Sequence, residues 1–287
     1  MAVTAILHQS EDWPAFAGAE WARTILSVPV TDRFHAKQGR SIGRWTLKST
    51  AGEELVVYLK RHYELPRVHG FLARLFPASA WSPGLQEWEH LRRAAAAGLP
   101  VPRAVAGGEF RGPGLKLQSF LAVEELTGML ALHEAIPLAF GRLPADAFAA
   151  WKRGLIRELA RLARELHRQR LFHKDLYLCH FYIAESDTAA APIDWRGRVV
   201  MIDFHRLGRH RFGWQWYVSK DLAQLLYSSD VMGIEDKDRL RFWKQYLVGN
   251  WAPTARPPGW VRRVVLWKWK RYRRHNAKRK ARTEPSG

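Results

Sequence analysis

The stretch HKDLYLCHF, residues 173–181, decides how this chain is interpreted. It follows the segment 149–170, in which leucines recur at spacings of four, three and four, the pattern of an amphipathic helix: Leu155, Leu159, Leu162 and Leu166. A short apolar segment at 181–184 then predicts a strand. We therefore expect Asp175 in a loop between a long helix and a short strand.

Three other charged residues lie on or directly after predicted strands and helices. Lys60 follows four apolar strand residues at 56–59, Glu87 lies on a predicted helix, and Asp203 ends a second apolar strand. Phosphoryl transfer needs a cation on the nucleotide phosphates, a carboxylate that holds this cation, a second carboxylate for the acceptor hydroxyl and a third for Mg²⁺. Mg²⁺ prefers oxygen ligands, which suits Asp203. These residues, together with Asp175, predict chemistry that uses ATP and Mg²⁺.

The residues around Asp175 depart from the pattern of protein kinases. Protein kinases carry H-R-D with Asn five residues beyond the Asp, and later D-F-G and A-P-E. Here His180 takes the place of the Asn, the second motif is IDFHR at 202–206, and no A-P-E follows. The pattern therefore disfavours an ordinary protein kinase.

Both motifs resemble those of the lipopolysaccharide kinase family, bacterial kinases that phosphorylate Kdo or core heptose sugars. The catalytic loop of that family has the form H-R-D-C-Y-I-C-H-F, and its metal strand has the form I-D-L-H-R. Three further stretches agree: HAKQGRS at 35–41, Glu87-Trp88, and KDLA at 220–223. The resemblance spans residues 34–229, and Lys174 and Leu176 are mild departures from it.

The resemblance implies an α+β, protein-kinase-like fold of two lobes that binds ATP in its cleft. We expect a small, strand-rich N-lobe at residues 1–125 and a larger, helical C-lobe at 126–259. A basic C-terminal tail would follow at 260–287.

The resemblance also implies roles for single residues. Lys60 would hold the α- and β-phosphates of ATP and pair with Glu87, although Glu89 is a competing candidate for that pairing. Asp175 would act as the catalytic base. Asp203 would bind Mg²⁺ and, through it, the nucleotide.

Three residues around the catalytic loop have less direct roles. His180 stands where Asn normally helps to hold the metal; because Mg²⁺ binds nitrogen poorly, a hydrogen bond to Asp175 or to a phosphate is the alternative. His173 is expected to brace the loop through a hydrogen bond, and Asp221 to brace it from a later helix.

A β-hairpin is expected around Lys60. Residues 44–49 and 54–61 alternate or run apolar, with Ala51-Gly52 as the turn between them. Gly39 and Gly43 precede the first strand and would either cover the nucleotide phosphates or form turns. The remaining expected elements are a helix at 85–97 that stops at Gly98, a strand at 115–123, a strand at 199–202, and helices at 218–227 and 237–248.

Composition excludes several classes of protein. The 287 residues carry a net charge of +19 and only one cysteine, Cys179, so a disulfide-stapled scaffold or a Cys-rich zinc module is excluded. No run of 18 residues lacks charge, and the first 13 residues do not resemble a signal peptide. We therefore expect a cytoplasmic protein, peripheral to the inner face of the membrane if it touches one.

The tail concentrates the positive charge, with 12 Lys and Arg against Glu284 from residue 251 onward. An apolar stripe lies within it at helical spacing: Val261, Val265, Trp269 and Tyr272. A basic amphipathic helix of this kind fits an anionic membrane surface, and a solvated face is the alternative. Nucleic acid is a less favoured partner.

The expected acceptor is a sugar hydroxyl of lipopolysaccharide or a related glycolipid. Kinases of small molecules, such as the aminoglycoside and choline types, usually keep Asn at the position of His180. A basic binding protein on an inert kinase scaffold is the non-enzymatic alternative, weakened because Lys60, Asp175 and Asp203 are all present.

Overall fold

The computed structural model describes residues 4–30, 33–35, 39–190 and 192–283, with the backbone alone for 33–35 and 276–283. The chain forms two compact units. The N-terminal unit comprises residues 1–96 and 101–127, and the C-terminal unit comprises 97–100 and 128–287. The first boundary therefore falls two residues beyond the expected end of the N-lobe, and the expected tail belongs to the C-terminal unit.

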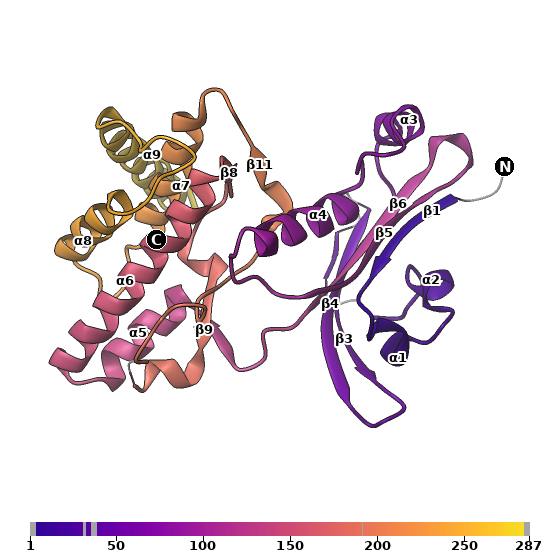
Figure 1. Ribbon diagram of the computed structural model, residues 1–287, viewed down its shortest axis with the longest axis horizontal. Coiled ribbons are helices and arrows are strands. Elements are labelled where there is room, and N and C mark those ends of the chain that lie inside the picture. Colours follow the sequence, from indigo (N-terminus) through magenta and orange to yellow (C-terminus); the bar gives the residue numbers. More distant parts are fainter. Residues whose placement is uncertain (1–3, 31–32, 36–38, 191, 284–287) are drawn as a thin grey trace. The chain divides into compact units, whose positions relative to one another are not determined.

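A six-stranded antiparallel sheet forms the N-terminal unit (Figure 1). Its strands are β1 (Thr4–Gln9), β2 (Arg33–His35), β3 (Arg40–Lys48), β4 (Glu54–His62), β5 (Ala104–Arg111) and β6 (Leu117–Glu124). They lie in the order β1-β5-β6-β4-β3-β2, so β4, which carries Lys60, is an interior strand. The helices that accompany them in the described residues are α1 (Trp13–Ala17), α2 (Trp21–Thr24), α3 (Arg67–Leu75) and α4 (Pro83–Ala96).

The predicted hairpin corresponds to β3 and β4, which pair in antiparallel register. Its turn closes where expected, since the Ser49 N–H donates to the Glu53 carbonyl at 2.9 Å and Gly52 has a φ of +84°, which favours glycine. The first strand is longer than expected, because it begins at Arg40. Gly43 therefore lies inside β3, opposite Leu59, and the prediction that it precedes the strand is wrong.

The sheet is covered on both faces (Figure 1). On one face, Trp13, Trp21 and Ile25 from the α1–α2 region pack in a buried cluster with Val57 and Phe120 of the sheet. Helix α4 covers the other face and buries Leu85, Trp88 and Leu91, in agreement with the helix expected at 85–97. The sheet thus holds β4 and α4 in a fixed relation to each other.

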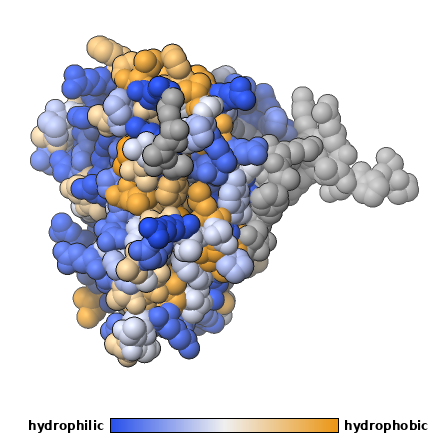
Figure 2. Space-filling model, turned by 90° about the vertical axis from the view of Figure 1, so that its right-hand side faces the viewer, coloured by the Kyte–Doolittle hydropathy of each residue, from blue (hydrophilic) through white to orange (hydrophobic). Residues whose placement is uncertain are grey.

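Helix α3 exposes an apolar face. Val68, Phe71 and Leu75 recur along one side of it, and each of these side chains is about half exposed, between 49% and 56%. The opposite side is made of small residues: Gly70 lies so close to the Leu115 carbonyl that a Cβ would be 2.0 Å from its oxygen. Hydrophobic side chains gather at the upper end of the face shown in Figure 2, on the side where α3 lies.

Helices dominate the C-terminal unit. They are α5 (Leu132–Arg142), α6 (Ala145–Arg168), α7 (Trp214–Ser228), α8 (Asp236–Leu247) and α9 (Trp260–Thr283). Short strands form two small antiparallel sheets, β7 (Met129–Ala131) with β9 (Phe181–Ala184) and β10 (Val200–Met201), and β8 (Leu171–Phe172) with β11 (Gly208–Arg209). The α+β class predicted from the sequence is confirmed.

The long helix α6 carries the predicted leucine stripe into the core. Leu155, Leu159, Leu162 and Leu166 are all at most 6% exposed. The chain leaves α6 at Arg168, forms β8 and then enters residues 173–181, so the catalytic loop is anchored between a buried helix and β9.

The apolar stripe of the basic C-terminal segment is largely occupied by protein contacts. Helix α9 packs along α7, where Val261 is fully buried and Val265 is 4% exposed. The expectation that this stripe faces a membrane is therefore wrong for its first half. Among the residues of α9 whose side chains are described, the large apolar ones that are exposed are instead Trp260, Leu266 and Trp267. Within the described residues, no helix is both long enough and apolar enough to span a bilayer.

Candidate functional site

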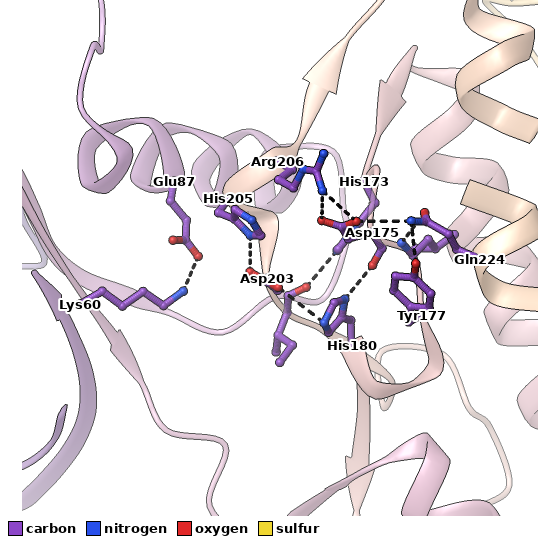
Figure 3. Close-up of polar contacts among 12 residues, drawn as sticks. Lys60, Glu87, His173, Asp175, Tyr177, His180, Asp203, His205, Arg206 and Gln224 are labelled. Atoms are coloured by element: carbon purple, nitrogen blue, oxygen red, sulfur yellow. Dashed lines mark hydrogen bonds and ion pairs between the residues drawn. The ribbon is translucent and has the colours of Figure 1, made fainter. Parts of the chain in front are cut away.

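The N-terminal unit brings Lys60 and Glu87 together. The Lys60 Nζ of β4 lies 2.7 Å from Oε1 of Glu87 on α4, and the glutamate side chain is 8% exposed (Figure 3). Glu89 is exposed, so the structure favours Glu87 over this competitor. Because the pair is largely shielded from water, it fixes the direction of the lysine ammonium better than a surface ion pair would.

The two predicted glycines differ in their surroundings. Gly39 lies in the turn before β3 with a φ of +54°, and a Cβ there would approach Glu64 at 3.1 Å. Gly43 is an extended, buried residue of β3. Residues 36–38 of the matching stretch lie outside the described residues. A turn thus accounts for Gly39, and a role in covering phosphates stays a prediction for both glycines.

Asp221 of α7 braces the catalytic loop, as expected. Its fully buried carboxylate accepts the backbone N–H of His173 at 2.9 Å and that of Lys174 at 2.8 Å. Lys174 has a φ of +68°, a left-handed conformation that costs a non-glycine residue on the order of 1–3 kcal/mol. The two hydrogen bonds therefore hold a strained turn immediately before Asp175.

Asp175 is oriented by two residues that the sequence did not single out. Nη1 of Arg206 lies 3.0 and 3.2 Å from the two carboxylate oxygens, and the amide of Gln224 donates to Oδ1 at 3.3 Å (Figure 3). The side chain of Asp175 is 17% exposed, so one side of it still reaches solvent. Arg206 belongs to the IDFHR motif, and this was the one signal that pointed to it.

His180 joins the two predicted acids of this unit. Its Nδ1 lies 2.7 Å from the Asp175 backbone carbonyl, and its Nε2 lies 3.5 Å from Oδ2 of Asp203. A carbonyl only accepts, so Nδ1 carries a hydrogen, and Nε2 would then face a carboxylate as an acceptor unless a proton or a cation lies there. Burial lowers the pKa of His180, but contacts with Cys179, the Asp175 carbonyl and Asp203 outweigh burial and raise it overall.

His173 has the bracing contact that the sequence predicted. The ring is fully buried, and its Nε2 lies 2.9 Å from the carbonyl of Ile202, the residue before Asp203. Burial lowers the pKa of His173, so the neutral ring donates its proton to this carbonyl. The contact ties the catalytic loop to the segment that carries Asp203.

Asp203 suits a magnesium ion that arrives with phosphate oxygens. It has a φ of +65°, its carboxylate is 30% exposed, and Nδ1 of His205 holds one of its oxygens at 2.5 Å. Among the described residues, no group of three or more His, Cys, Asp and Glu could hold a metal by itself. Mg²⁺ is often held by one or two carboxylates together with substrate phosphates, which fits Asp203. A metal contact from His180 stays a prediction.

Comparisons with known proteins agree with this geometry. Residues 37–246 match the family model described as the lipopolysaccharide kinase (Kdo/WaaP) family. The lipopolysaccharide core heptose(I) kinase WaaP of Pseudomonas aeruginosa is 32% identical over 161 residues, and that of Escherichia coli is 30% identical over 162 residues. Each match covers 56% of this chain and 58% of the relative, so it spans somewhat more than half the length of either protein.

A solved structure shares the fold. WaaP in complex with acyl carrier protein superimposes with a TM-score of 0.66 at 24% identity, covering 93% of this chain and 98% of that one. Together, the family match and the shared fold account for the motifs at both acids.

Proposed function

Since the chain belongs to the lipopolysaccharide kinase (Kdo/WaaP) family, we propose that it transfers the γ-phosphoryl group of ATP to a sugar hydroxyl of lipopolysaccharide or a related glycolipid. The observation that carries this proposal is the arrangement around Asp175, whose carboxylate is oriented by Arg206 and Gln224 and is linked through His180 to Asp203. Because the relatives are named core heptose(I) kinases, a core heptose is the favoured acceptor.

In the proposed reaction, Asp175 receives the proton of the attacking sugar hydroxyl. A general base must lie within hydrogen-bond reach of that proton, and the partly exposed carboxylate of Asp175 offers an oxygen toward solvent. Arg206 and Gln224 restrict the rotation of this carboxylate, which keeps it ready for an incoming hydroxyl.

The nucleotide would be held by Lys60 and by a magnesium ion on Asp203. The Lys60–Glu87 pair keeps an ammonium fixed for the α- and β-phosphates. Bound Mg²⁺ would offset the negative charge that builds up on the phosphate oxygens. His205 and His180, on the two oxygens of Asp203, keep its carboxylate oriented.

Since the proposed acceptor is a membrane glycolipid, we also propose contact with an anionic membrane surface on the cytoplasmic side. On α9 the support comes from the side turned away from α7, where Trp260 and Trp267 are exposed among basic residues. The exposed apolar face of α3 supports it independently, since it lies between Arg67 and Arg74.

An acyl carrier protein is a proposed partner, because a relative of the same fold binds one. The C-terminal unit offers a suitable feature, an almost wholly apolar cavity of about 340 Å³ lined by α6, α7, α8 and α9, with Leu159, Leu226 and Trp269 in its wall. Mass spectrometry of the purified chain for a co-purified acyl carrier protein, with Leu226→Asp as the variant that should lose it, tests this partner.

The kinase proposal is tested by transfer of radiolabel from ATP into extracted glycolipid, followed by mapping of the phosphorylated sugar. Asp175→Asn should lower transfer by at least about a hundredfold, the range typical of a lost general base. Glu87→Gln should impair ATP use, whereas Glu89→Gln, an identical change two residues away on the same helix, should not. If the wild-type chain transfers no label and Asp175→Asn behaves as the wild type does, the chain is a binding protein on a kinase scaffold.

A further inference from the structure

Another pocket, lined by basic residues, lies in the C-terminal unit, apart from the apolar cavity. It has a volume of about 390 Å³ and lies between α7 and α9. The residues that line it are Lys220, Lys268, Arg271, Tyr272 and His275. These side chains are cationic, imidazole or phenolic, and no carboxylate lines the pocket among the residues that the structure describes.

Lys268 is unusual because it is buried with no acidic partner among the described residues. It is 8% exposed, and its ammonium contacts aromatic faces, with Nζ 3.5 Å from the centroid of Trp216. Lys152 of α6 is a fair comparison, since it is 6% exposed, and there Asp238 lies 2.6 Å from the ammonium. Burying a charge is costly unless an opposite charge compensates it, and an aromatic face offsets this cost only in part. An external anion would give Lys268 the compensating negative charge that Asp238 gives Lys152.

The other cations of the pocket add to this excess of positive charge. In the described part of the chain, the side chains of Lys220 and Arg271 form no ion pair and no hydrogen bond, and Arg271 lies 5.8 Å from the ring of Trp267. Burial lowers the pKa of Lys268, and the charges of Arg271 and Lys220 lower it further. The three cations thus repel one another in one pocket, and an oxyanion between them would relieve that repulsion.

The pocket adjoins the catalytic loop. Lys220 precedes Asp221, whose carboxylate accepts the backbone N–H of Lys174 at 2.8 Å. Burial lowers the pKa of Lys174, and the charge of Lys220 lowers it further. On the other side, the ring of Tyr272 lies 6.0 Å from the ring of Tyr227 on α7, and Gln224, three residues earlier on that helix, donates to Asp175 at 3.3 Å. Helix α7 therefore lines the pocket with Lys220 and contacts the Asp175 carboxylate with Gln224.

We propose that this pocket binds an oxyanion, a phosphate or carboxylate, carried by the acceptor glycolipid, while a sugar hydroxyl of the same molecule is presented to Asp175. Lysine and arginine form strong charge-assisted hydrogen bonds to such groups, and partial burial strengthens them. The identity of the acceptor rests on the proposed kinase function, but the binding of an oxyanion does not. The pocket would select anionic glycolipids over neutral sugars.

The test compares two pairs of substitutions in the full-length chain. Lys220→Gln with Arg271→Gln removes two positive charges from the pocket. Arg92→Gln with Arg93→Gln removes the same charge from exposed positions of α4, outside the pocket. Calorimetry with extracted phosphorylated glycolipid should show binding weakened by about tenfold or more in the pocket pair and unchanged in the α4 pair, since hydrogen bonds to charged groups are lost. Affinity for ATP should be the same in both.

The source of the anion is decided by three probes: inorganic phosphate, chemically dephosphorylated glycolipid, and anionic phospholipid vesicles without glycolipid. If the anion is a phosphate of the acceptor, dephosphorylation removes the advantage of the wild type over the pocket pair; if it is a carboxylate of the acceptor, that advantage survives dephosphorylation. In both cases vesicle binding is equal in the wild type and the pocket pair. A pocket pair that loses only vesicle binding makes this a site for lipid head groups, and one that loses only inorganic phosphate makes it a site for free phosphate. Either result overturns the proposal.

Failure of the pocket and failure of the kinase function give different results. If the pocket pair still transfers label and keeps the affinity and KM of the wild type for glycolipid, the proposal about the pocket is wrong and the kinase function stands. Weakened binding in a chain that transfers no label would overturn the kinase function alone. Should the double variant fold poorly, as judged by its unfolding midpoint, the single change Arg271→Gln at an exposed position provides the same comparison.

Discussion

At the scale of single residues, His180 is the position where this chain differs most clearly from a protein kinase. The ring spans two groups at once, donating from Nδ1 to the Asp175 carbonyl and turning Nε2 toward Asp203. An asparagine is shorter and can satisfy one of these contacts but not both. The histidine therefore couples the position of the catalytic loop to that of the Asp203 carboxylate.

We predict that His180→Asn lowers kcat/KM for phosphoryl transfer by about tenfold to a hundredfold, the usual effect of losing a group that orients a metal ligand or a catalytic residue. Steady-state kinetics with ATP and glycolipid measures this. The unfolding midpoint should stay close to that of the wild type, so that the loss belongs to the site. Kinetics equal to those of the wild type would show that His180 is a neutral replacement for Asn.

Among the site residues, those that the sequence could identify are the ones defined by local pattern. Lys60 and Asp203 each follow a run of four apolar residues, and Glu87 occupies a predicted helix. Arg206 and Gln224 could not be assigned contacts in this way, because they reach Asp175 from 31 and 49 residues away along the chain. Only the folded C-terminal unit brings such distant side chains to one carboxylate.

At the scale of elements, strand β5 shows why part of the sheet was missed. Its sequence contains Gly107 and Gly108, which weaken a strand prediction because glycine has low strand propensity. The structure needs both: a Cβ at Gly107 would lie 2.9 Å from the ring of Trp88, and one at Gly108 would lie 2.4 Å from the Ile6 carbonyl oxygen. Close packing of β5 against α4 and β1 therefore requires glycines, and their low strand propensity is the reason why the strand was not predicted from the sequence.

Helix α7 is the element on which the catalytic loop depends, through Asp221. We predict that Asp221→Asn lowers the free energy of unfolding by about 1–3 kcal/mol, because the amide turns an N–H₂ group toward one of the two backbone N–H donors and leaves it unpaired. Urea unfolding followed by circular dichroism measures the change. The same substitution at the exposed Asp146 should alter stability by less than about 0.5 kcal/mol. Equal effects at both positions would contradict a bracing role for Asp221.

At the scale of the whole molecule, where the net charge is +19, helix α9 has two roles: it packs in the C-terminal unit, and it exposes a basic surface. One side of this helix packs on α7 and borders both the apolar cavity and the basic pocket. The other side is exposed and basic, with Trp267 among its cations. Sequence periodicity identified the helix and its apolar stripe but could not tell whether protein or lipid covers that stripe, since both select the same residues.

Two truncations separate these roles. A chain that ends at Gly259 loses Val261 and Val265, which are 0% and 4% exposed, and a fully buried valine contributes about 1.5–3 kcal/mol, so the free energy of unfolding should fall by about 3 kcal/mol or more. A chain that ends at His275 keeps both valines together with Lys268 and Tyr272, yet it loses the cations Lys278, Arg279, Lys280 and Arg282. Its stability should therefore stay within about 0.5 kcal/mol of the wild type.

The chain that ends at His275 should nonetheless bind anionic vesicles more weakly than the wild type, because each basic residue near such a surface contributes about 1 kcal/mol. Urea unfolding and vesicle flotation at one fixed salt concentration measure the two effects on the same preparations. Should the chain ending at Gly259 be as stable as the wild type, α9 would be an appendage rather than part of the fold. Should the chain ending at His275 bind vesicles unchanged, its last basic residues would have no part in membrane contact, and the exposed face of α3 would be the remaining surface to vary.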